Sequence, residues 1–274
     1  MTTIVAPGKL MIAGEYAVLD GAPAIVLAVD RGVQCEIAVS DRLEISTPDG
    51  DDRFVRPALD GHIGQYTFSA WNPTHLPDKP GFGGSAAACV AACLAAGRPA
   101  SDALELHHEI QGGGSGVDVL ASIHGGMIRA HRLNATPLDP IHPVVVWSGQ
   151  SAKTQPRVDH YLSSPGREAF VAESTAIVDA FAEDPLSMLR ENSQLLMHMS
   201  VETGLPYMTP KLAAIRRLAK QFGGAAKPSG AGGGDCAIAL FPDPDAEKAF
   251  EAAAQTKGLI LIPYNVAGQA RLLG

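Results

Sequence analysis

Short apolar segments separated by turn residues dominate the first forty positions of the chain. The segments TIVA, LMIA and AIVLAV consist mainly of aliphatic residues, and Pro7–Gly8 and Asp20–Gly21 stand between them. Runs of this kind bounded by Gly, Pro and Asp are typical of strands joined by turns. The pattern predicts strands near residues 3–6, 10–13, 24–29 and 33–40, and two less regular strands at 42–46 and 65–70.

Helical patterns alternate with further strands in the rest of the chain. An alanine-rich segment predicts a helix at 84–96, Ser101 is a suitable N-cap for a helix at 101–110, and a short helix follows the glycines at 112–116. Further helices are expected at 156–164, 167–182, 186–202, 209–222 and 244–256, with strands in the segments GMIRAHRL, PVVVW, CAIALF and GLILIPY. Because strands in hairpin-like order precede this alternation, an α+β fold is favoured over a doubly wound parallel sheet.

The composition allows one large domain or two small ones. The chain has 274 residues, of which 46% are hydrophobic and 5% aromatic, so a core built mainly from Ala, Val, Leu and Ile is expected. The buried strand PVVVW opens a second half. We therefore expect an N-terminal domain at residues 1–140 and a C-terminal domain at residues 141–274.

Charge and cysteine usage exclude several classes of protein. The net charge of −8 and the lack of a Lys/Arg run argue against a nucleic-acid-binding module. The N-terminus lacks the features of a signal peptide, and no long uncharged apolar window is present, so a cytoplasmic protein without a membrane span is expected. The four cysteines form no C-x-x-C pair and the histidines have no metal-site spacing, which predicts buried thiols and no structural zinc.

Three glycine-rich segments carry the candidate chemistry. In the first, GFGGSAAA, glycines precede a helix whose N-terminus would present free N–H groups and the Ser85 hydroxyl to a phosphate or its Mg²⁺. The segment is neither a Walker loop nor a Rossmann fingerprint. Taken alone, it could also be a turn capped by serine.

The other two segments add charged residues. GGGSGVDV carries Asp118 at the start of a helix, where a carboxylate could equally serve the helix dipole, and KPSGAGGGDC combines Lys227, Ser229 and Asp235 with four glycines. A flexible linker is the alternative for the latter. Lys9 lies between apolar strand residues, so either it reaches solvent or it pairs with a carboxylate such as Asp118.

These segments together resemble the motifs of the GHMP kinase superfamily. APGKLMIAGEYAVLDGAPAI is similar to the first motif, PGFGGSAAA to the phosphate loop and KPSGAGGGDCAIAL to the third. Within the superfamily, the segments GKLMIAGEYAVL, GSGVDV and SGAGGGDC are similar to those of phosphomevalonate kinases. The resemblance implies a two-lobed fold, with an N-terminal domain of mixed β-sheet and helices and a C-terminal ferredoxin-like α/β sandwich. Members of this subfamily are usually longer, and the shortfall lies between residues 50 and 80, beside the expected adenine pocket.

The resemblance also implies a reaction, namely transfer of the ATP γ-phosphoryl group to (R)-5-phosphomevalonate with Mg²⁺. A phosphomonoester has a second pKa of about 6, so the acceptor would be largely dianionic at neutral pH. No strong base would then be needed to remove a proton from it. Lys9 would bridge the attacking and transferred phosphates, and Asp118 would orient Lys9 or bind Mg²⁺ through water.

Binding roles follow from the same resemblance. The phosphate loop at 80–88 would bind nucleotide through Pro80, Gly81, Gly83, Gly84, Ser85 and Ala86, with Ser85 contacting Mg²⁺. The substrate side would comprise Glu15, Tyr16, Ser115, Ser151, Lys153, Thr154, Ser229, Gly230, Ala231 and Gly232. For Glu15 a structural role, and for Lys153 a surface position, are the alternatives.

Two other functions remain open at this point. The chain could be a mevalonate kinase or another small-molecule kinase of the same fold, in which case a hydroxyl acceptor would make Asp118 far more important. It could also be an inactive ligand sensor, since the segment between 50 and 80 is short, although Lys9, Ser85 and Asp118 are all present. We expect a monomer or homodimer.

Overall fold

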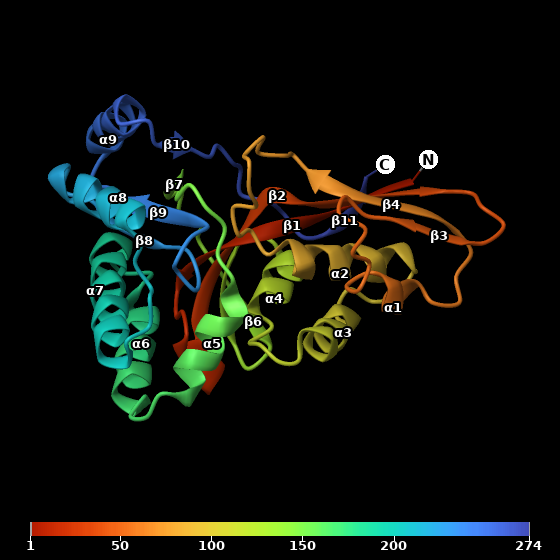
Figure 1. Ribbon diagram of the computed structural model, residues 1–274, viewed down its shortest axis with the longest axis horizontal. Helices are drawn as coiled ribbons and strands as arrows, with labels where there is room; N and C mark the ends of the chain where they lie inside the picture. The colour runs from red at the N-terminus through yellow and green to blue at the C-terminus, as the bar shows by residue number, and fades with distance from the viewer. Residues whose placement is uncertain (1, 274) are drawn as a thin grey trace.

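The fold consists of two β-sheets, each with helices packed against it (Figure 1). The computed structural model describes residues 2–273. The first sheet contains the long strands β1 (Thr2–Ala13) and β2 (Ala24–Ala38), which pair antiparallel. The second sheet lies at the other end of the molecule. The expected α+β fold with two lobes is confirmed.

The first sheet has seven strands, and its main path runs in the order β11-β1-β2-β4-β3. Its other strands are β3 (Leu43–Ser46), β4 (Gly64–Trp71), β5 (Met127–His131), β6 (Asn134–Leu138) and β11 (Arg271–Leu273). Helices on one side of this sheet are α1 (Arg56–Leu59), α2 (Gly84–Ala95), α3 (Asp102–Gln111) and α4 (Val117–His124) (Figure 1). Seven residues of α2 are buried, because its alanines and cysteines allow the helix to pack closely on the sheet.

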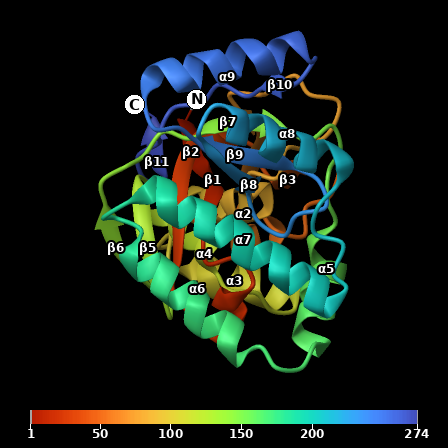
Figure 2. The ribbon, with the colours of Figure 1, turned by 90° about the vertical axis from the view of Figure 1, so that its left-hand side faces the viewer.

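The second sheet is antiparallel, with the order β10-β7-β9-β8. Its strands are β7 (Val144–Trp147), β8 (Ala225–Pro228), β9 (Cys236–Leu240) and β10 (Ile260–Leu261). The helices of this lobe are α5 (Thr154–Ser163), α6 (Glu168–Ala180), α7 (Pro185–Thr203), α8 (Pro210–Gln221) and α9 (Pro244–Thr256) (Figure 2). This is the ferredoxin-like arrangement expected for the second lobe.

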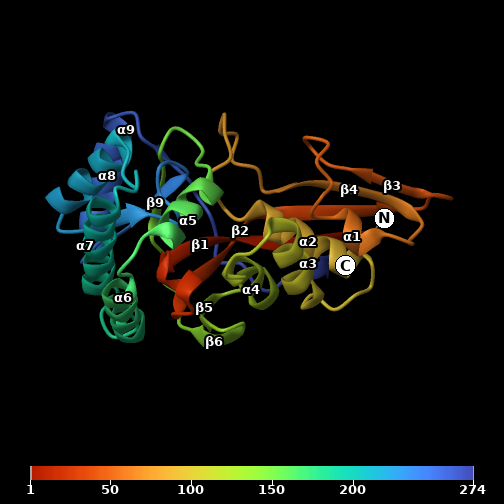
Figure 3. The same cartoon turned by 60° about the horizontal axis from the view of Figure 1, so that its bottom comes forward.

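Apolar side chains on the two faces of β7 contact both lobes. Val144 and Val146 belong to the cluster formed with α8 and α9. Val145 and Trp147, on the opposite face, share a cluster with residues of β1 and β2. β1 and β2 therefore extend through the first lobe and end against the second, close to α5 (Figure 3).

The expected turn at Pro7–Gly8 and the expected break between the strands at 24–29 and 33–40 were wrong, because β1 and β2 are each continuous. The register shifts between the pairs Ala6–Val33 and Gly8–Val29, so residues 30–32 of β2 bulge opposite Pro7 inside the ladder. A side chain at Gly32 would collide with the backbone carbonyl of Ala6. The glycines thus allow the two strands to cross closely at the bulge.

Several short elements were not predicted. These are the 3-10 helix η1 (Ala17–Asp20) and the elements α1, β6, β8 and β11. Ser101 occupies the N-cap position of α3 as predicted, but it has helical backbone angles and its side chain makes no capping hydrogen bond.

The C-terminal segment returns to the first sheet. β11 pairs with β1 through Leu273 and Thr3, although we expected residues 141–274 to form the second domain. We propose the domain division near residue 140 for the rest of the chain. No helix within residues 2–273 has the length and apolar character needed to cross a bilayer.

Candidate active site

An open cavity of about 1850 Å³ lies where the three glycine-rich segments meet. The first segment lies between β4 and α2, the second between α3 and α4, and the third between β8 and β9. Each contributes residues to the cavity wall. The fold therefore brings together three segments that are far apart in the sequence.

The phosphate-loop candidate is held against β1. The backbone N–H of Lys9 donates a hydrogen bond to the carbonyl of Phe82 at 2.9 Å. Gly83 adopts a left-handed conformation (φ 70°) as the N-cap of α2, and a Cβ there would lie 3.2 Å from both Asp118 Oδ2 and Lys9 Cγ. A glycine thus lets the loop lie directly on these two side chains, with the free N–H groups of α2 at the cavity.

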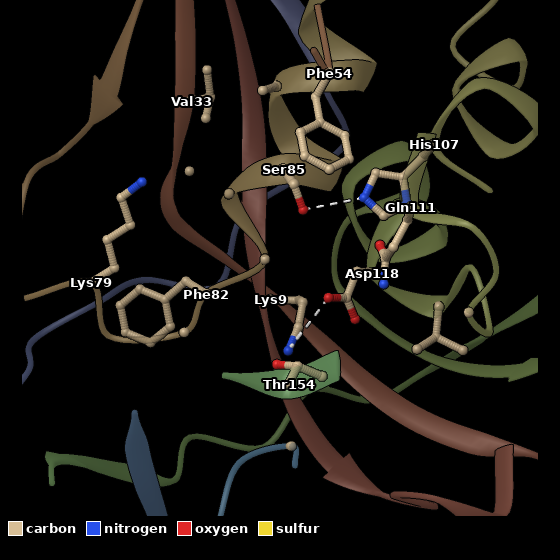
Figure 4. Close-up of a pocket in the computed structure, with 18 of the residues that line it drawn as sticks. Lys9, Val33, Phe54, Lys79, Phe82, Ser85, His107, Gln111, Asp118 and Thr154 are labelled. Atoms are coloured by element: carbon tan, nitrogen blue, oxygen red, sulfur yellow. Dashed lines mark hydrogen bonds and ion pairs between the residues drawn. The ribbon is translucent and has the colours of Figure 1, made fainter. Parts of the chain in front are cut away.

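Lys9 and Asp118 form an ion pair inside this cavity, with Nζ and Oδ2 3.6 Å apart (Figure 4). The Lys9 side chain is 10% exposed and that of Asp118 is 37% exposed. Asp118 lies in the first turn of α4, whose N-terminus favours a negative charge. The pairing expected from the sequence is confirmed, and the alternative in which Lys9 reaches solvent was wrong.

The Ser85 hydroxyl has a partner that the sequence did not suggest. Its Oγ lies 3.2 Å from Nε2 of His107 on α3 (Figure 4). Burial lowers the pKa of His107, and the nearby Asp118 carboxylate partly opposes this effect. His108 on the same helix is exposed, so the two adjacent histidines face different directions. Ala86 is fully buried in the core and does not line the cavity.

Residues of the third segment fix the cavity wall to β1. The Ser229 hydroxyl accepts a hydrogen bond from the N–H of Met11 at 2.8 Å. A Cβ on Gly230 would lie 3.9 Å from Lys9 Nζ, so this loop borders the lysine. Ala231 borders the cavity and its carbonyl accepts from the hydroxyl of Tyr16 at 2.5 Å. Gly232 packs against Tyr207 and lies outside the cavity wall.

Glu15 and Tyr16 border the cavity but have partners within the protein. One carboxylate oxygen of Glu15 forms an ion pair with Lys227, and the other accepts from Asn192 Nδ2 at 3.0 Å. Tyr16 is buried, with its ring 5.1 Å from that of Tyr161. Burial raises the pKa of Tyr16 and lowers that of Lys227. The contacts of Glu15 correspond to the structural alternative.

The remaining substrate-side candidates divide into two groups. Ser115, Ser151 and Thr154 line the cavity. Lys153 is exposed at the N-cap of α5 and is not part of the cavity wall, which corresponds to its surface alternative.

Asp235, which the sequence placed in the third segment without a specific role, and Phe54, which the sequence did not single out, both line the cavity. Asp235 Oδ1 accepts from the N–H of Ala152 at 2.8 Å, and its side chain packs against Gly81, so it joins the third segment to the phosphate loop. Burial raises the pKa of Asp235. Phe54 belongs to the short segment between residues 50 and 80. Together with Val55, Phe68 and Trp71 of the same segment, it makes one part of the cavity wall apolar.

The residues at the cavity fit a nucleotide-bound Mg²⁺. Within residues 2–273, no group of three or more His, Cys, Asp or Glu side chains is arranged to hold a metal. Mg²⁺ commonly takes one or two protein oxygens together with phosphate oxygens and water. Ser85 and Asp118 both line the cavity and could supply such oxygens.

Comparison with known proteins gives a consistent result. A family profile described as GHMP kinases C terminal matches residues 177–258. The phosphomevalonate kinase of Streptomyces sp. (strain CL190) is 31% identical, and the alignment of 363 residues covers 96% of both chains. A mevalonate kinase from Aeropyrum pernix is 28% identical over 92% of each chain.

Solved structures show the same fold. The Lin0012 protein from Listeria innocua has a TM-score of 0.88 at 23% identity and covers 99% of both chains. A Streptococcus pneumoniae phosphomevalonate kinase in complex with phosphomevalonate and AMPPNP has a TM-score of 0.80 at 19% identity, covering 97% of this chain and 100% of the other.

Proposed function

Since the chain belongs to the GHMP kinase family, we propose that it transfers the γ-phosphoryl group of ATP to (R)-5-phosphomevalonate, giving 5-diphosphomevalonate and ADP. The observation that carries the proposal is the Lys9–Asp118 pair beneath the N-terminus of α2. A cation beside free helix N–H groups suits the meeting point of two phosphates. The proposal also takes Mg·ATP as the co-substrate and the cytoplasm as the location of the enzyme.

Positioning and positive potential would account for most of the catalysis. Lys9 would lie between the attacking oxygen and the γ-phosphoryl group and lessen the repulsion between two polyanions. The loop at 80–84 and the Ser85 hydroxyl would bind the nucleotide phosphates. Magnesium carried by ATP would neutralise part of the phosphate charge.

Asp118 would act mainly by holding Lys9 in this reaction. A phosphate acceptor is already ionised near neutral pH, so no proton has to be removed. Ser115, Ser151 and Thr154, which line the cavity, are the proposed contacts for the acceptor. Gly230 and Ala231 would border the same space, and Ser229 would support it through Met11.

Mevalonate kinase activity is the second candidate. It is favoured by the identity of 28% to the Aeropyrum pernix mevalonate kinase and by the partial exposure of Asp118, which could take a proton from a hydroxyl acceptor. An inactive ligand sensor has less support, because Lys9, Ser85 and Asp118 all line one cavity.

One assay separates these candidates. ADP release is measured with Mg·ATP and either mevalonate or 5-phosphomevalonate, for the wild type, Lys9→Met and Asp118→Ala. Turnover with 5-phosphomevalonate alone, abolished in Lys9→Met, is the expected result. Turnover with mevalonate alone would make the chain a mevalonate kinase, and a folded protein inactive with both would overturn the proposal.

A further inference from the structure

His107 contacts a candidate nucleotide-binding residue from a neighbouring helix. It lies on α3, whereas Ser85 lies in the first turn of α2, and their side chains meet at the cavity (Figure 4). The proposed reaction assigns no role to this ring. Yet Ser85 Oγ has the imidazole as its hydrogen-bond partner among residues 2–273.

The His107 ring is held firmly in this position. The residue is 7% exposed, and its ring centroid lies 5.2 Å from that of Phe54 with an angle of 31° between the planes. A ring that is buried and packed in this way loses little further freedom when its nitrogen bonds the serine. The imidazole is therefore a rigid partner for a small and mobile hydroxyl.

A serine at the start of a helix has several conformations available to it. Its Cα–Cβ bond can occupy different staggered rotamers, and its hydroxyl can also bond to nearby backbone groups. A hydrogen bond to Nε2 selects the rotamer in which Oγ faces α3 at the cavity. If the ring nitrogen accepts the hydroxyl proton, both lone pairs of Oγ are left for a cation. If the ring donates, the hydroxyl proton is left for a phosphate oxygen.

We propose that His107 is a positioning residue that fixes the Ser85 hydroxyl for contact with the phosphates of the nucleotide or their metal ion. This inference rests on the proposed function only in requiring that Ser85 contacts Mg·ATP. His107 acts through Ser85 and touches neither the acceptor nor the transferred group.

The test measures binding of Mg·AMPPNP to the full chain by isothermal titration calorimetry. The variants are Ser85→Ala, His107→Phe, the double variant and His107→Gln, whose amide nitrogen can reach the position of Nε2. His62→Phe is the matched control, since His62 bonds to Ala96 at the opposite end of α2. His107→Asn, which is too short to reach Ser85, replaces His107→Phe if the larger side chain impairs folding.

We expect Ser85→Ala and His107→Phe each to weaken binding by roughly 3- to 10-fold, the loss of one hydrogen bond. The double variant should bind no more weakly than the weaker single variant, because both changes remove the same contact. His107→Gln should recover most of the loss, and His62→Phe should bind like the wild type.

Losses that multiply in the double variant would overturn the inference, as would normal binding by His107→Phe or no recovery in His107→Gln. Failure of the wild type to bind Mg·AMPPNP would overturn the kinase proposal and this inference with it. If the wild type binds Mg·AMPPNP but the losses of the two single variants multiply in the double variant, only the role proposed for His107 is overturned.

Discussion

Lys227 and Glu15 form a buried ion pair that connects the two sheets. Lys227 belongs to β8 and Glu15 follows β1, and their side chains are 0% and 2% exposed. Lys227 also donates to the carbonyls of Met11 at 3.3 Å and Pro228 at 3.0 Å. Since Ser229 lies directly after β8, this pair holds the third glycine-rich segment beside β1.

Replacing Lys227 by Met should lower the free energy of unfolding by about 3–5 kcal/mol, because Glu15 would remain buried without its charged partner. Changing Glu15 to Gln as well should restore a large part of this loss, since the amide is neutral and can still accept from Asn192. Urea denaturation of both variants measures the effect. A loss below about 1 kcal/mol in Lys227→Met would contradict the prediction.

Substitution of Gly83 should impair phosphoryl transfer more than stability. Gly83→Ala places a methyl group against Lys9 and Asp118, whereas Gly97→Ala offers a matched control. Gly97 has nearly the same left-handed backbone (φ 68°) with nothing within 4 Å of the added Cβ. Both variants should lose about 1–2 kcal/mol of stability from backbone strain.

Only Gly83→Ala should also lose roughly tenfold or more in kcat. A displacement of about 1 Å in Lys9 or Asp118, the proposed catalytic side chains, is enough to slow the reaction this much. Thermal melts and steady-state kinetics of the two alanine variants provide the comparison. Equal kcat values in both would show that the close approach of this loop is unimportant.

The charge of Lys9 should matter more to the rate than that of Asp118. We expect Lys9→Met to reduce kcat by at least about 100-fold, comparable to loss of an oxyanion donor. Asp118→Asn, which keeps the shape and removes the charge, should reduce it by only about tenfold with a phosphate acceptor, because no base is required. Single-turnover kinetics with saturating Mg·ATP measure both effects. A larger loss in Asp118→Asn than in Lys9→Met would instead favour a hydroxyl acceptor.

Asp20 should make stability depend on pH in the acid range. Its carboxylate accepts from Arg167 Nη2 at 3.0 Å and from the Tyr161 hydroxyl at 2.6 Å, and the bond from Arg167 lowers its pKa below the usual 3.8. The carboxylate thus stabilises the fold fully above its unfolded pKa, and this contribution is lost as the pH falls through the lowered pKa.

At pH 7, Asp20→Asn should therefore be less stable than the wild type by about 1–3 kcal/mol. The difference should begin to shrink below about pH 4, where the Asp20 carboxyl of the unfolded chain becomes protonated, and should disappear once the pH falls below the lowered pKa of the folded protein. Thermal unfolding at several pH values tests this, with the exposed Asp41→Asn as control. A difference that stays constant down to pH 3 would rule out the carboxylate as its source.

Local patterns were sufficient to predict most helices and the pairing of Lys9 with Asp118. Glycines before an alanine-rich helix and a lysine within an apolar strand each restrict the possible structures strongly. The continuity of β1 was missed because Pro7 and Gly8 resemble a turn, and the bulge of β2 around Gly32, which accommodates them within the ladder, depends on tertiary contacts.

Contacts between distant residues explain what local patterns could not reveal at the site. Glu15 carries the charge expected of a ligand, but its partners Lys227 and Asn192 lie more than 170 positions away. His107 could not be connected to Ser85 before the packing of α3 against α2 was known. A residue's type indicates what it can bind, whereas the fold decides which partner is present.

The pairing of β11 with β1 also affects how the chain folds during synthesis. Without residues 271–273, the backbone groups of Thr3, Ile4 and Val5 on that side of β1 lack their strand partner. A ribosome makes β1 before β11, so this edge stays open until residues 271–273 have been made. A nascent chain would be exposed to edge-to-edge association at this strand, and a chaperone that covers extended segments would protect it there.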